Sequence, residues 1–511
     1  MTNTTHPAGA AATFDPRAPD PCETNPREAD PDALDPHGCA AVRDQEVPVP
    51  GRGDAAGSRK RVLMLAAPAT YRAGAFANAA GAAEVEVLRG VDLPAALAMQ
   101  WPGALSFDFS DPEAAADAIV AFARDTPLDA ILSLDDSAAL VAALASAGLG
   151  LRHNPPRAAL AARDKGVMRE ALAAGGVPVP TFRRFSRDVD AAGAAMRVGY
   201  PCVVKPLRLS GSRGVIRADD PDQFVAAFGR LRRMLESEGG PGSDEILVED
   251  YLPGVEVALE GLLTGGELHV LALFDKPDPL EGPFFEETLY ITPSRLTPEV
   301  QEAIAEMTAR SLAAIGLREG PIHAELRVNE RGPWLLEVAA RSIGGLCSSV
   351  LQFGTDVCLE ELILRHAAGM ALPELARSGR AAGVMMIPIP RGGVLRGYHG
   401  VDEARAVPGV EGVEITARAH YPLVPLPEGA SYLGFIFARA ETPAEAEAAL
   451  RAAHACLRFD IAPEIPLIPL VMPVGPHGAH GALGDHTAHS EPRAPGLVGR
   501  DARASEQERD A

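Results

Sequence analysis

Residues 200–214 read Tyr200-Pro-Cys-Val-Val-Lys-Pro-Leu-Arg-Leu-Ser-Gly-Ser-Arg-Gly214. The apolar, β-branched run that ends at Val204 predicts a buried strand, which delivers Lys205 and breaks at Pro206. A loop with two glycines follows, and a ligand can approach its backbone closely because glycine has no Cβ atom. A buried lysine beside such a loop favours a polyphosphate ligand, although the loop on its own also fits an ordinary hairpin turn.

Lysine is scarce in this chain. Of the 47 Lys and Arg residues, four are lysine, namely Lys60, Lys165, Lys205 and Lys276. Arginine therefore serves wherever any cation suffices, and lysine stands where a compact point charge is needed in place of a planar fork. This usage makes the lysines candidate ligand-binding residues.

The composition limits the class of protein. At 511 residues and 47% hydrophobic content, the chain can fill roughly three domain cores. A formal net charge of −22 argues against general binding to nucleic acid or to an anionic membrane. No apolar run reaches the roughly 18 residues that span a bilayer, and no signal peptide is visible. Six cysteines without paired or metal-ligand spacing indicate reduced thiols, so we expect a cytoplasmic protein.

Strand-like and helix-like segments alternate early in the chain. Strands are predicted near residues 60–67, 83–88 and 128–134, and an amphipathic helix at 112–125. This alternation is typical of an open α/β sheet, in which ligands bind beyond the carboxyl ends of the strands. Asp135 and Asp136 follow the third strand, so they either face a ligand or cap the next helix.

Residues 320–341 predict a hairpin in which two carboxylates face each other. If Val328 pairs with Trp334, then Glu325 lies opposite Glu337. Beyond the turn, Trp334, Leu336 and Val338 alternate with Leu335 and Glu337. Facing carboxylates at about 5 Å repel each other, and a divalent cation between them removes the repulsion. The alternative is that Glu337 pairs with a cation such as Arg341 while Glu325 is solvated.

Arg341 is followed by Ser342-Ile-Gly-Gly345. A guanidinium beside flexible backbone suits a developing oxyanion. A plain structural salt bridge is the competing interpretation.

Taken in order, these motifs resemble the ATP-grasp superfamily over about residues 60–375, and within it the L-amino acid ligase group of carboxylate–amine ligases. The set comprises Lys165, Lys205 with its Ser-Gly-Ser-Arg-Gly loop, Glu249-Asp-Tyr-Leu-Pro-Gly-Val-Glu256, Glu325 and Glu337-Val-Ala-Ala-Arg341. The resemblance implies an α/β and α+β protein with an ATP-grasp fold. We expect an amino-terminal open α/β domain at 59–160, the ATP-grasp domain at 161–375 and a small α+β domain at 376–471, between disordered tails at 1–58 and 472–511.

The resemblance also implies how ATP and Mg²⁺ are held, with Mn²⁺ as an alternative ion. Lys165 and Lys205 would hold the α- and β-phosphates, and Glu325 and Glu337 would carry the metal. The backbone of the glycine loop would cover the phosphates through Ser210, Gly211, Ser212 and Gly214. Glu249 and Leu252 would offer main-chain groups to adenine. Glu256 would accept hydrogen bonds from the ribose hydroxyls, unless it is simply a solvated strand residue.

The catalytic residues implied by the resemblance are Arg341, Lys276 and Glu287. Arg341 would steady an acyl phosphate and a tetrahedral intermediate. Glu287, in the segment Phe284-Phe-Glu-Glu287, would lie near the substrate amine, and Lys276 would face the phosphates.

Two positions depart from the family pattern. Ala339 stands where many ATP-grasp enzymes have an asparagine two residues after the second metal glutamate, which puts a second Mg²⁺ in question. Tyr290 stands where the ligase group commonly has a histidine, so the acceptor chemistry can differ.

The leading hypothesis is an ATP-dependent ligase that forms a C–N bond between a small-molecule carboxylate and an amine, with an amino acid as one substrate. One alternative is a carboxylase that phosphorylates bicarbonate, although the chain has no biotin-carrier Met-Lys motif. Another is a nucleotide-binding module without catalysis. We expect no nucleic-acid or membrane partner, and the sequence leaves a homo-oligomer open. Specificity would depend on the loops near Asp136, Glu287 and Gly344.

Overall fold

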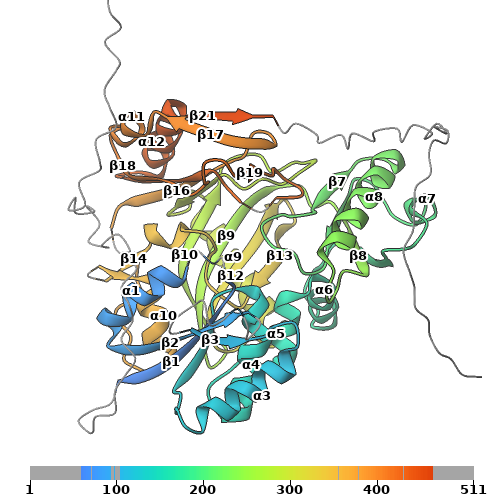
Figure 1. Ribbon diagram of the computed structural model, residues 1–511. Helices are drawn as coiled ribbons and strands as arrows, with labels where there is room; N and C mark the ends of the chain where they lie inside the picture. Colours follow the sequence, from blue (N-terminus) through green and yellow to red (C-terminus); the bar gives the residue numbers. More distant parts are fainter. Residues whose placement is uncertain are drawn as a thin grey trace, which may run out of the picture. The chain divides into compact units, whose positions relative to one another are not determined.

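The computed structural model describes residues 59–463, apart from residues 69, 71, 94–96, 98–103, 355, 378 and 430. The predictions of disordered tails at 1–58 and 472–511 lie outside the described residues. Within the described part, the strands form five sheets, whose elements can be followed in Figure 1.

The amino-terminal sheet is parallel and has the strand order β3-β2-β1-β4. Its region contains β1 (Lys60–Ala66), α1 (Ala73–Ala83), β2 (Val85–Asp92), β3 (Ala104–Phe107), α3 (Pro112–Ala123), β4 (Ala130–Ser133), a 3₁₀ turn (Asp136–Ala138), α4 (Ala139–Leu149) and α5 (Pro156–Arg163). The predicted open α/β sheet is confirmed. Because β1 and β4 are parallel neighbours, the loops that follow them meet at one edge of the sheet.

A second sheet is antiparallel and has the order β5-β8-β6-β7. Its region contains α6 (Lys165–Ala174), β5 (Phe182–Ser186), α7 (Ala191–Ala195), β6 (Cys202–Pro206), β7 (Ile216–Ala218), α8 (Pro221–Glu238) and β8 (Glu245–Asp250). Phe224, Phe228 and Leu231 lie on one face of α8 and are buried against the strands. Since β6 and β7 pair directly, the glycine loop is indeed a hairpin connection.

The largest sheet has eight strands in the order β13-β12-β9-β10-β11-β16-β20-β18. Its first part contains β9 (Val255–Thr264), β10 (Glu267–Lys276), β11 (Leu289–Thr292), α9 (Pro298–Ile315), β12 (Gly320–Asn329) and β13 (Gly332–Ala339), followed by a 3₁₀ turn (Cys347–Val350), β14 (Gln352–Phe353), β15 (Val357–Cys358) and α10 (Leu359–Ala367). The carboxyl-terminal part contains β16 (Ala381–Ile387), β17 (Gly393–His399), α11 (Val401–Arg405), β18 (Val410–Ile415), β19 (Pro422–Leu423), β20 (Gly434–Ala440), α12 (Pro443–Cys456) and β21 (Arg458–Ala462). Because β11 pairs with β16, the carboxyl-terminal part shares this sheet with the region before it.

The two faces of the large sheet differ in chemistry. Ile322, Ala324 and Leu326 of β12 belong to an apolar cluster with buried side chains of α9. Successive side chains of a strand point to opposite faces, so the residues between them lie on the other face. Those residues are His323, Glu325 and Arg327.

The register of the β12–β13 hairpin brings two acids together. Glu325 pairs directly with Glu337, which confirms the predicted juxtaposition. The predicted pairing of Val328 with Trp334 is wrong, since Val328 pairs with Pro333. The two registers differ by one residue, and an irregularity between Glu325 and Leu326 connects them.

A β-bulge at Leu336 explains the shift. Leu326 pairs with Leu335, so Leu336 is the extra residue before Glu337. Strict alternation would put Leu335 and Glu337 on the same face. With the bulge, Leu335 and Val338 both join the apolar cluster, while Glu337 turns to the polar face.

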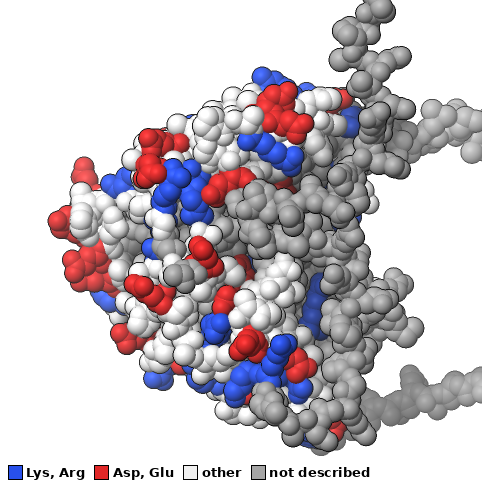
Figure 2. Space-filling model, turned by 90° about the vertical axis from the view of Figure 1, so that its left-hand side faces the viewer, with Lys and Arg blue, Asp and Glu red and all other residues white. Residues whose placement is uncertain are grey.

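Two features of the described residues bear on whether the chain crosses a membrane or binds nucleic acid. Within the described residues, we find no helix with the length and apolar character needed to cross a bilayer. On the face that Figure 2 shows, acidic and basic side chains are interspersed, an arrangement unlike the clustered Lys/Arg stripe of nucleic-acid-binding domains.

Candidate active site

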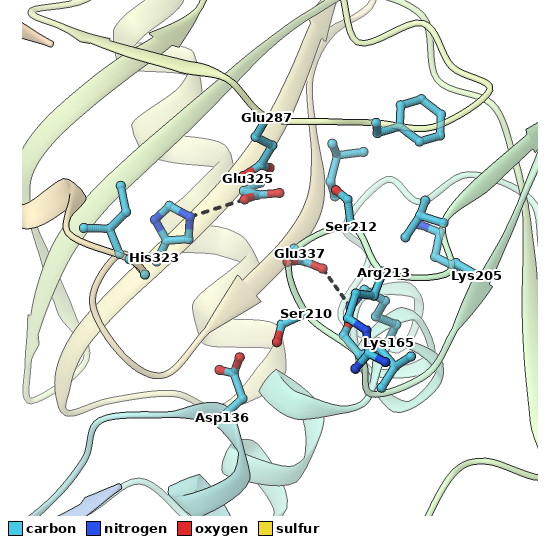
Figure 3. Close-up of a pocket in the computed structure, with 18 of the residues that line it drawn as sticks. Asp136, Lys165, Lys205, Ser210, Ser212, Arg213, Glu287, His323, Glu325 and Glu337 are labelled. Carbon is cyan, nitrogen blue, oxygen red and sulfur yellow. Dashed lines mark hydrogen bonds and ion pairs between the residues drawn. The ribbon is translucent and has the colours of Figure 1, made fainter. Parts of the chain in front are cut away.

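A cavity of about 890 Å³ collects most of the predicted site residues. Lys165 and Lys205 line it together with Glu325 and Glu337 (Figure 3), and Arg341 lines it as well. The amino-terminal sheet edge, the β6–β7 loop, the large sheet and the carboxyl-terminal part all contribute to its wall. Its volume is in the range of small-molecule sites.

Lys165 connects the glycine loop to one of the facing acids. Its ammonium donates to the carbonyl of Leu209 (3.0 Å) and pairs with Glu337 (2.8 Å). Burial opposes the charged form of Lys165, but the charges of Glu337 and Asp136 outweigh it and raise its pKa. Glu337 thus pairs with a cation, as the alternative interpretation had it, but the cation is Lys165, and Glu325 is not solvated, since its side chain is 14% exposed and contacts Lys276.

Lys205 belongs to a buried triad that the sequence did not predict. Its ammonium lies 2.5 Å from one oxygen of Glu249, and Nε of Arg169 lies 2.7 Å from the other. Burial disfavours the Glu249 carboxylate, but Arg169 and Lys205 lower its pKa to about 2. Arg169 stands four residues after Lys165 on α6, a spacing that puts both side chains on one helix face.

The expected adenine contacts are largely engaged within the protein. Glu249 lies in the inner strand β8 and has neighbours on both sides, in β5 and β6. The carbonyl of Leu252 accepts a hydrogen bond from Arg327 (2.7 Å). The Leu252 carbonyl thus has an internal partner, whereas Glu249 and Leu252 both line the cavity, so main-chain contacts from these residues to adenine stay a prediction.

The glycine loop has the backbone that its sequence predicts. Gly211, Ser212 and Gly214 all have positive φ, at 64°, 56° and 69°. A Cβ on Gly214 would lie 2.8 Å from Leu231, so this position requires glycine. The amide of Gly214 donates to the carbonyl of Pro427 (2.9 Å). The loop lines the cavity from Ser210 to Arg213, but the Gly214 amide is already used.

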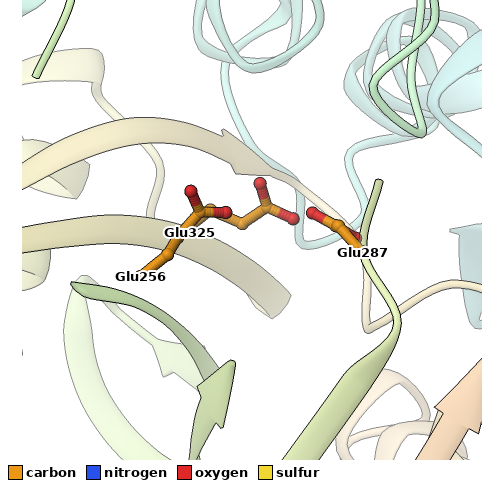
Figure 4. A group of neighbouring side chains, drawn as sticks. All are labelled: Glu256, Glu287 and Glu325. Atoms are coloured by element: carbon orange, nitrogen blue, oxygen red, sulfur yellow. The ribbon is translucent and has the colours of Figure 1, made fainter. Parts of the chain in front are cut away.

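Lys276 lies among three carboxylates. Its ammonium is 2.9 Å from Glu256, 2.7 Å from Glu287 and 3.3 Å from Glu325. Figure 4 shows the three acids. Oxygen atoms of these three acids lie within 4.8 Å of one another, a spacing that a metal ion could also bridge. Lys276 contacts all three acids, Arg327 also pairs with Glu256, and His323 lies 3.3 Å from Glu325, so we interpret the group as a buried ion network.

Two expectations bear on this network. Lys276 is 6% exposed and is not one of the cavity-lining residues, although its three acidic partners line the cavity, so its contact with the phosphates stays a prediction. Glu256 is buried, and its two oxygens pair with Lys276 and with Nε of Arg327 (3.0 Å). Glu256 is thus not a solvated strand residue, and a ribose hydroxyl would have to share its oxygens with these cations.

Glu287 has the chemistry of a group that exchanges protons near neutral pH. It lines the cavity and accepts a hydrogen bond from the hydroxyl of Tyr290 (2.8 Å). Burial and the charge of Glu325 raise its pKa to about 7. Tyr290, which replaces the common histidine, thus orients this carboxylate.

His323 and Glu260 are further residues that the sequence did not assign. Nδ1 of His323 contacts Glu260, and Nε2 lies 3.3 Å from Glu325. Burial lowers the pKa of His323, but the two carboxylates outweigh this and raise it to about 9. Glu260 also accepts from the amide of Ile343 (3.1 Å), which ties the loop after Arg341 to β9.

Arg341 reaches the edge of the amino-terminal sheet. Its guanidinium pairs with Asp136 (2.8 Å), so it forms a salt bridge and lines the cavity at once. Asp135 accepts from the amide of Ala67 (2.8 Å) and the hydroxyl of Thr70 (3.0 Å). Asp135 precedes the 3₁₀ turn without a side-chain capping bond, so the capping alternative does not hold for it.

Two family models match this chain. Residues 198–350 match the ATP-grasp domain, and residues 385–462 match the L-amino acid ligase C-terminal domain 2. The second match begins within β16, in the part of the large sheet that follows α10.

Similar proteins include ligases. An uncharacterized protein of Sinorhizobium fredii, y4rH, is 30% identical over 59% of this chain and 61% of its own length. The alanine–anticapsin ligase of Bacillus subtilis is 31% identical over 46% of this chain and 53% of its own length. The alignments thus span less than two thirds of these relatives.

A solved structure resembles more of the chain. The L-amino acid ligase from Bacillus licheniformis superposes with a TM-score of 0.68 and 26% identity. The match covers 79% of this chain and 99% of that ligase.

Proposed function

The chain belongs to the ATP-grasp superfamily and resembles the L-amino acid ligases, and on this basis we propose that it is an ATP-dependent carboxylate–amine ligase. The reaction would join a carboxylate to an amine through an acyl phosphate, with an amino acid as one substrate, and would release ADP and phosphate.

The observation that carries the proposal is the facing pair Glu325 and Glu337 in one cavity with Lys165 and Lys205. Two carboxylates on adjacent strands fit Mg²⁺ or Mn²⁺, and Glu325 and Glu337 would hold the ion together with phosphate oxygens of ATP. When bound, the ion would neutralise phosphate charge. Lys165 now compensates Glu337 and is placed to move to a phosphate when ATP binds.

The chain's own residues then have distinct roles. An oxygen of the substrate carboxylate bonds to the γ-phosphorus and ADP leaves; the amine nitrogen next bonds to the carbonyl carbon, phosphate leaves and the nitrogen loses a proton. Arg341 would stabilise the oxyanion of the tetrahedral state. Glu287, with its pKa of about 7, would take the proton, and Lys276 would position Glu287 as a buried neighbour.

The first test is substrate-dependent ADP release. We expect ADP from ATP and Mg²⁺ only when both a carboxylate and an amine from an amino-acid and small-acid pool are present, with the new amide identified by mass spectrometry. Bicarbonate-stimulated turnover without an amine would favour the carboxylase instead. Tight ATP binding without turnover in any pool would favour a nucleotide-binding module.

Gly344 offers a test of where the substrate side chain lies. It lines the cavity, and a Cβ added there would meet no atom within 4 Å. Gly344→Leu should fill this space and raise KM for bulky substrates by about 10-fold, while small substrates stay near wild type. Steady-state kinetics with amino acids of graded size measures this. Gly344→Ala is the control, and an equal loss for all sizes would contradict the placement.

A further inference from the structure

Arg72 is a buried cation in the cavity wall. It immediately precedes α1, in the connection from β1, and its residue exposure is 6%. Its guanidinium donates to the carbonyl of Leu134 and to the hydroxyl of Ser342, the neighbour of Arg341. Its carbon Cζ also lies 5.7 Å from the centre of the Phe76 ring. These contacts fix the direction of the guanidinium. No carboxylate of the described residues forms an ion pair with it, although the charges of Asp135, Glu360 and Glu260 act on it from farther away.

The other cations that line the cavity mostly have an acidic partner. The pairs are Lys165 with Glu337, Lys205 with Glu249, Arg208 with Asp164, Arg213 with Glu238, Arg327 with Glu256 and Arg341 with Asp136. Among the described residues, neither Arg72 nor Arg163 has a carboxylate within ion-pair distance. Of these two, only Arg72 is more than nine-tenths buried.

A buried charge without an ion-pair partner is unfavourable, and such groups cluster at sites where a ligand supplies the opposite charge. Burial, and then the nearby charge of Arg341, lower the pKa of Arg72 to about 10. Arg72 is still protonated at neutral pH. The guanidinium has five N–H groups, and two accepting groups leave some of them for a ligand.

We propose that Arg72 binds the free carboxylate of the amine substrate and so selects acceptors that carry one. This inference rests on the proposed ligase activity. A planar guanidinium matches a carboxylate in two parallel hydrogen bonds. The triphosphate is assigned to Lys165, Lys205 and the glycine loop, whereas Arg72 comes from the amino-terminal sheet edge beside Ser342. Arg341 lies next to Ser342, so the bound carboxylate would sit close to the reacting carbonyl.

The test compares acceptors with and without a carboxylate. The common L-amino acids and their carboxamides serve as acceptors at saturating ATP and donor, because a carboxamide cannot act as the donor. In the wild type, we expect the carboxamide to have the higher KM. Arg72→Gln should raise KM for the amino acid by about 10- to 100-fold and leave KM for the carboxamide unchanged. Arg72→Lys should restore part of the preference.

Arg163→Gln is the matched control, since it removes another unpaired arginine of the same cavity. It should leave the ratio of the two KM values unchanged. An equal fall of kcat for both acceptors in Arg72→Gln would overturn the inference and assign Arg72 to the acyl phosphate. If Arg72→Gln still has a lower KM for the amino acid than for its carboxamide, the inference is overturned as well.

A binding measurement separates this inference from the proposed activity. Calorimetry with Mg²⁺ and a non-hydrolysable ATP analogue compares the same amino acids and carboxamides without turnover. A carboxylate preference that disappears in Arg72→Gln supports the inference even if no amide forms. If amide formation is normal but the preference for amino acids over carboxamides is the same in Arg72→Gln, the inference about Arg72 is refuted while the proposed ligase activity stands.

Discussion

Glu337→Gln should reduce substrate-dependent ADP release by about 10²- to 10³-fold, because the facing carboxylate pair would lose half of its charge. Glu337 pairs with Glu325 across the hairpin and holds the ammonium of Lys165 at 2.8 Å. Gln has nearly the same shape, so the loss reports charge and not packing. Steady-state ADP release at graded Mg²⁺ concentrations measures the effect, and the concentration of Mg²⁺ for half-maximal rate should rise.

Glu330→Gln is the matched control. Glu330 lies in the exposed turn of the same hairpin, so its loss should leave both the rate and the Mg²⁺ dependence unchanged. The thermal unfolding temperature should be similar in both variants, since Glu337 is partly exposed and its ion pair contributes little to stability. A Glu337→Gln enzyme with wild-type turnover would remove the main support for the proposed metal pair.

The order of the motifs was predictable because each belongs to one local element. A β-branched strand ending in Lys205, a glycine loop and an alternating hairpin can be recognised within about ten residues each. The juxtaposition of Glu325 and Glu337 followed from such a local pattern. The exact register could not be predicted from that pattern. It depends on the bulge at Leu336, which lets both Leu335 and Val338 pack into the apolar cluster with α9.

The buried ion networks could not be predicted in the same way. Arg169 meets Glu249 across 80 residues, and Arg341 meets Asp136 across 205 residues. Such pairs depend on how sheets approach each other, which no local pattern encodes. Lys276 is an example. Because lysine is scarce in this chain, Lys276 was predicted to bind a ligand. The fold instead buries it among Glu256, Glu287 and Glu325.

The shared sheet is a second feature beyond local patterns. The sequence placed a boundary near residue 376, where the composition changes little. The structure pairs β11 with β16, so eight strands form one sheet across that position. Strand pairing between distant segments depends on which edges the fold brings together, and a local pattern within one strand does not specify its partner.

Glu249→Gln should lower the free energy of unfolding by about 3–5 kcal/mol, the usual cost of leaving buried cations without their partner. Glu249 is 3% exposed and compensates both Arg169 and Lys205. Its pKa is about 2 in the folded chain against an ordinary value of 4.5. The lowered pKa means that the ionised form stabilises the fold. This contribution is fully present above about pH 4.5 and is lost as the pH falls toward about 2.

Urea denaturation followed by circular dichroism, at pH values from about 7 down to about 3.5, measures both parts of this prediction. The stability difference between the wild type and Glu249→Gln should be largest near neutral pH and should narrow below about pH 4.5. Glu245→Gln is the control, because Glu245 lies on the same strand but is 34% exposed in its pair with Arg184. The substitution should change the free energy of unfolding by no more than about 1 kcal/mol.

Glu249 also holds Lys205 in place, so Glu249→Gln should raise KM for ATP. A loss of stability without any change in KM would show that Lys205 does not need Glu249 to bind ATP.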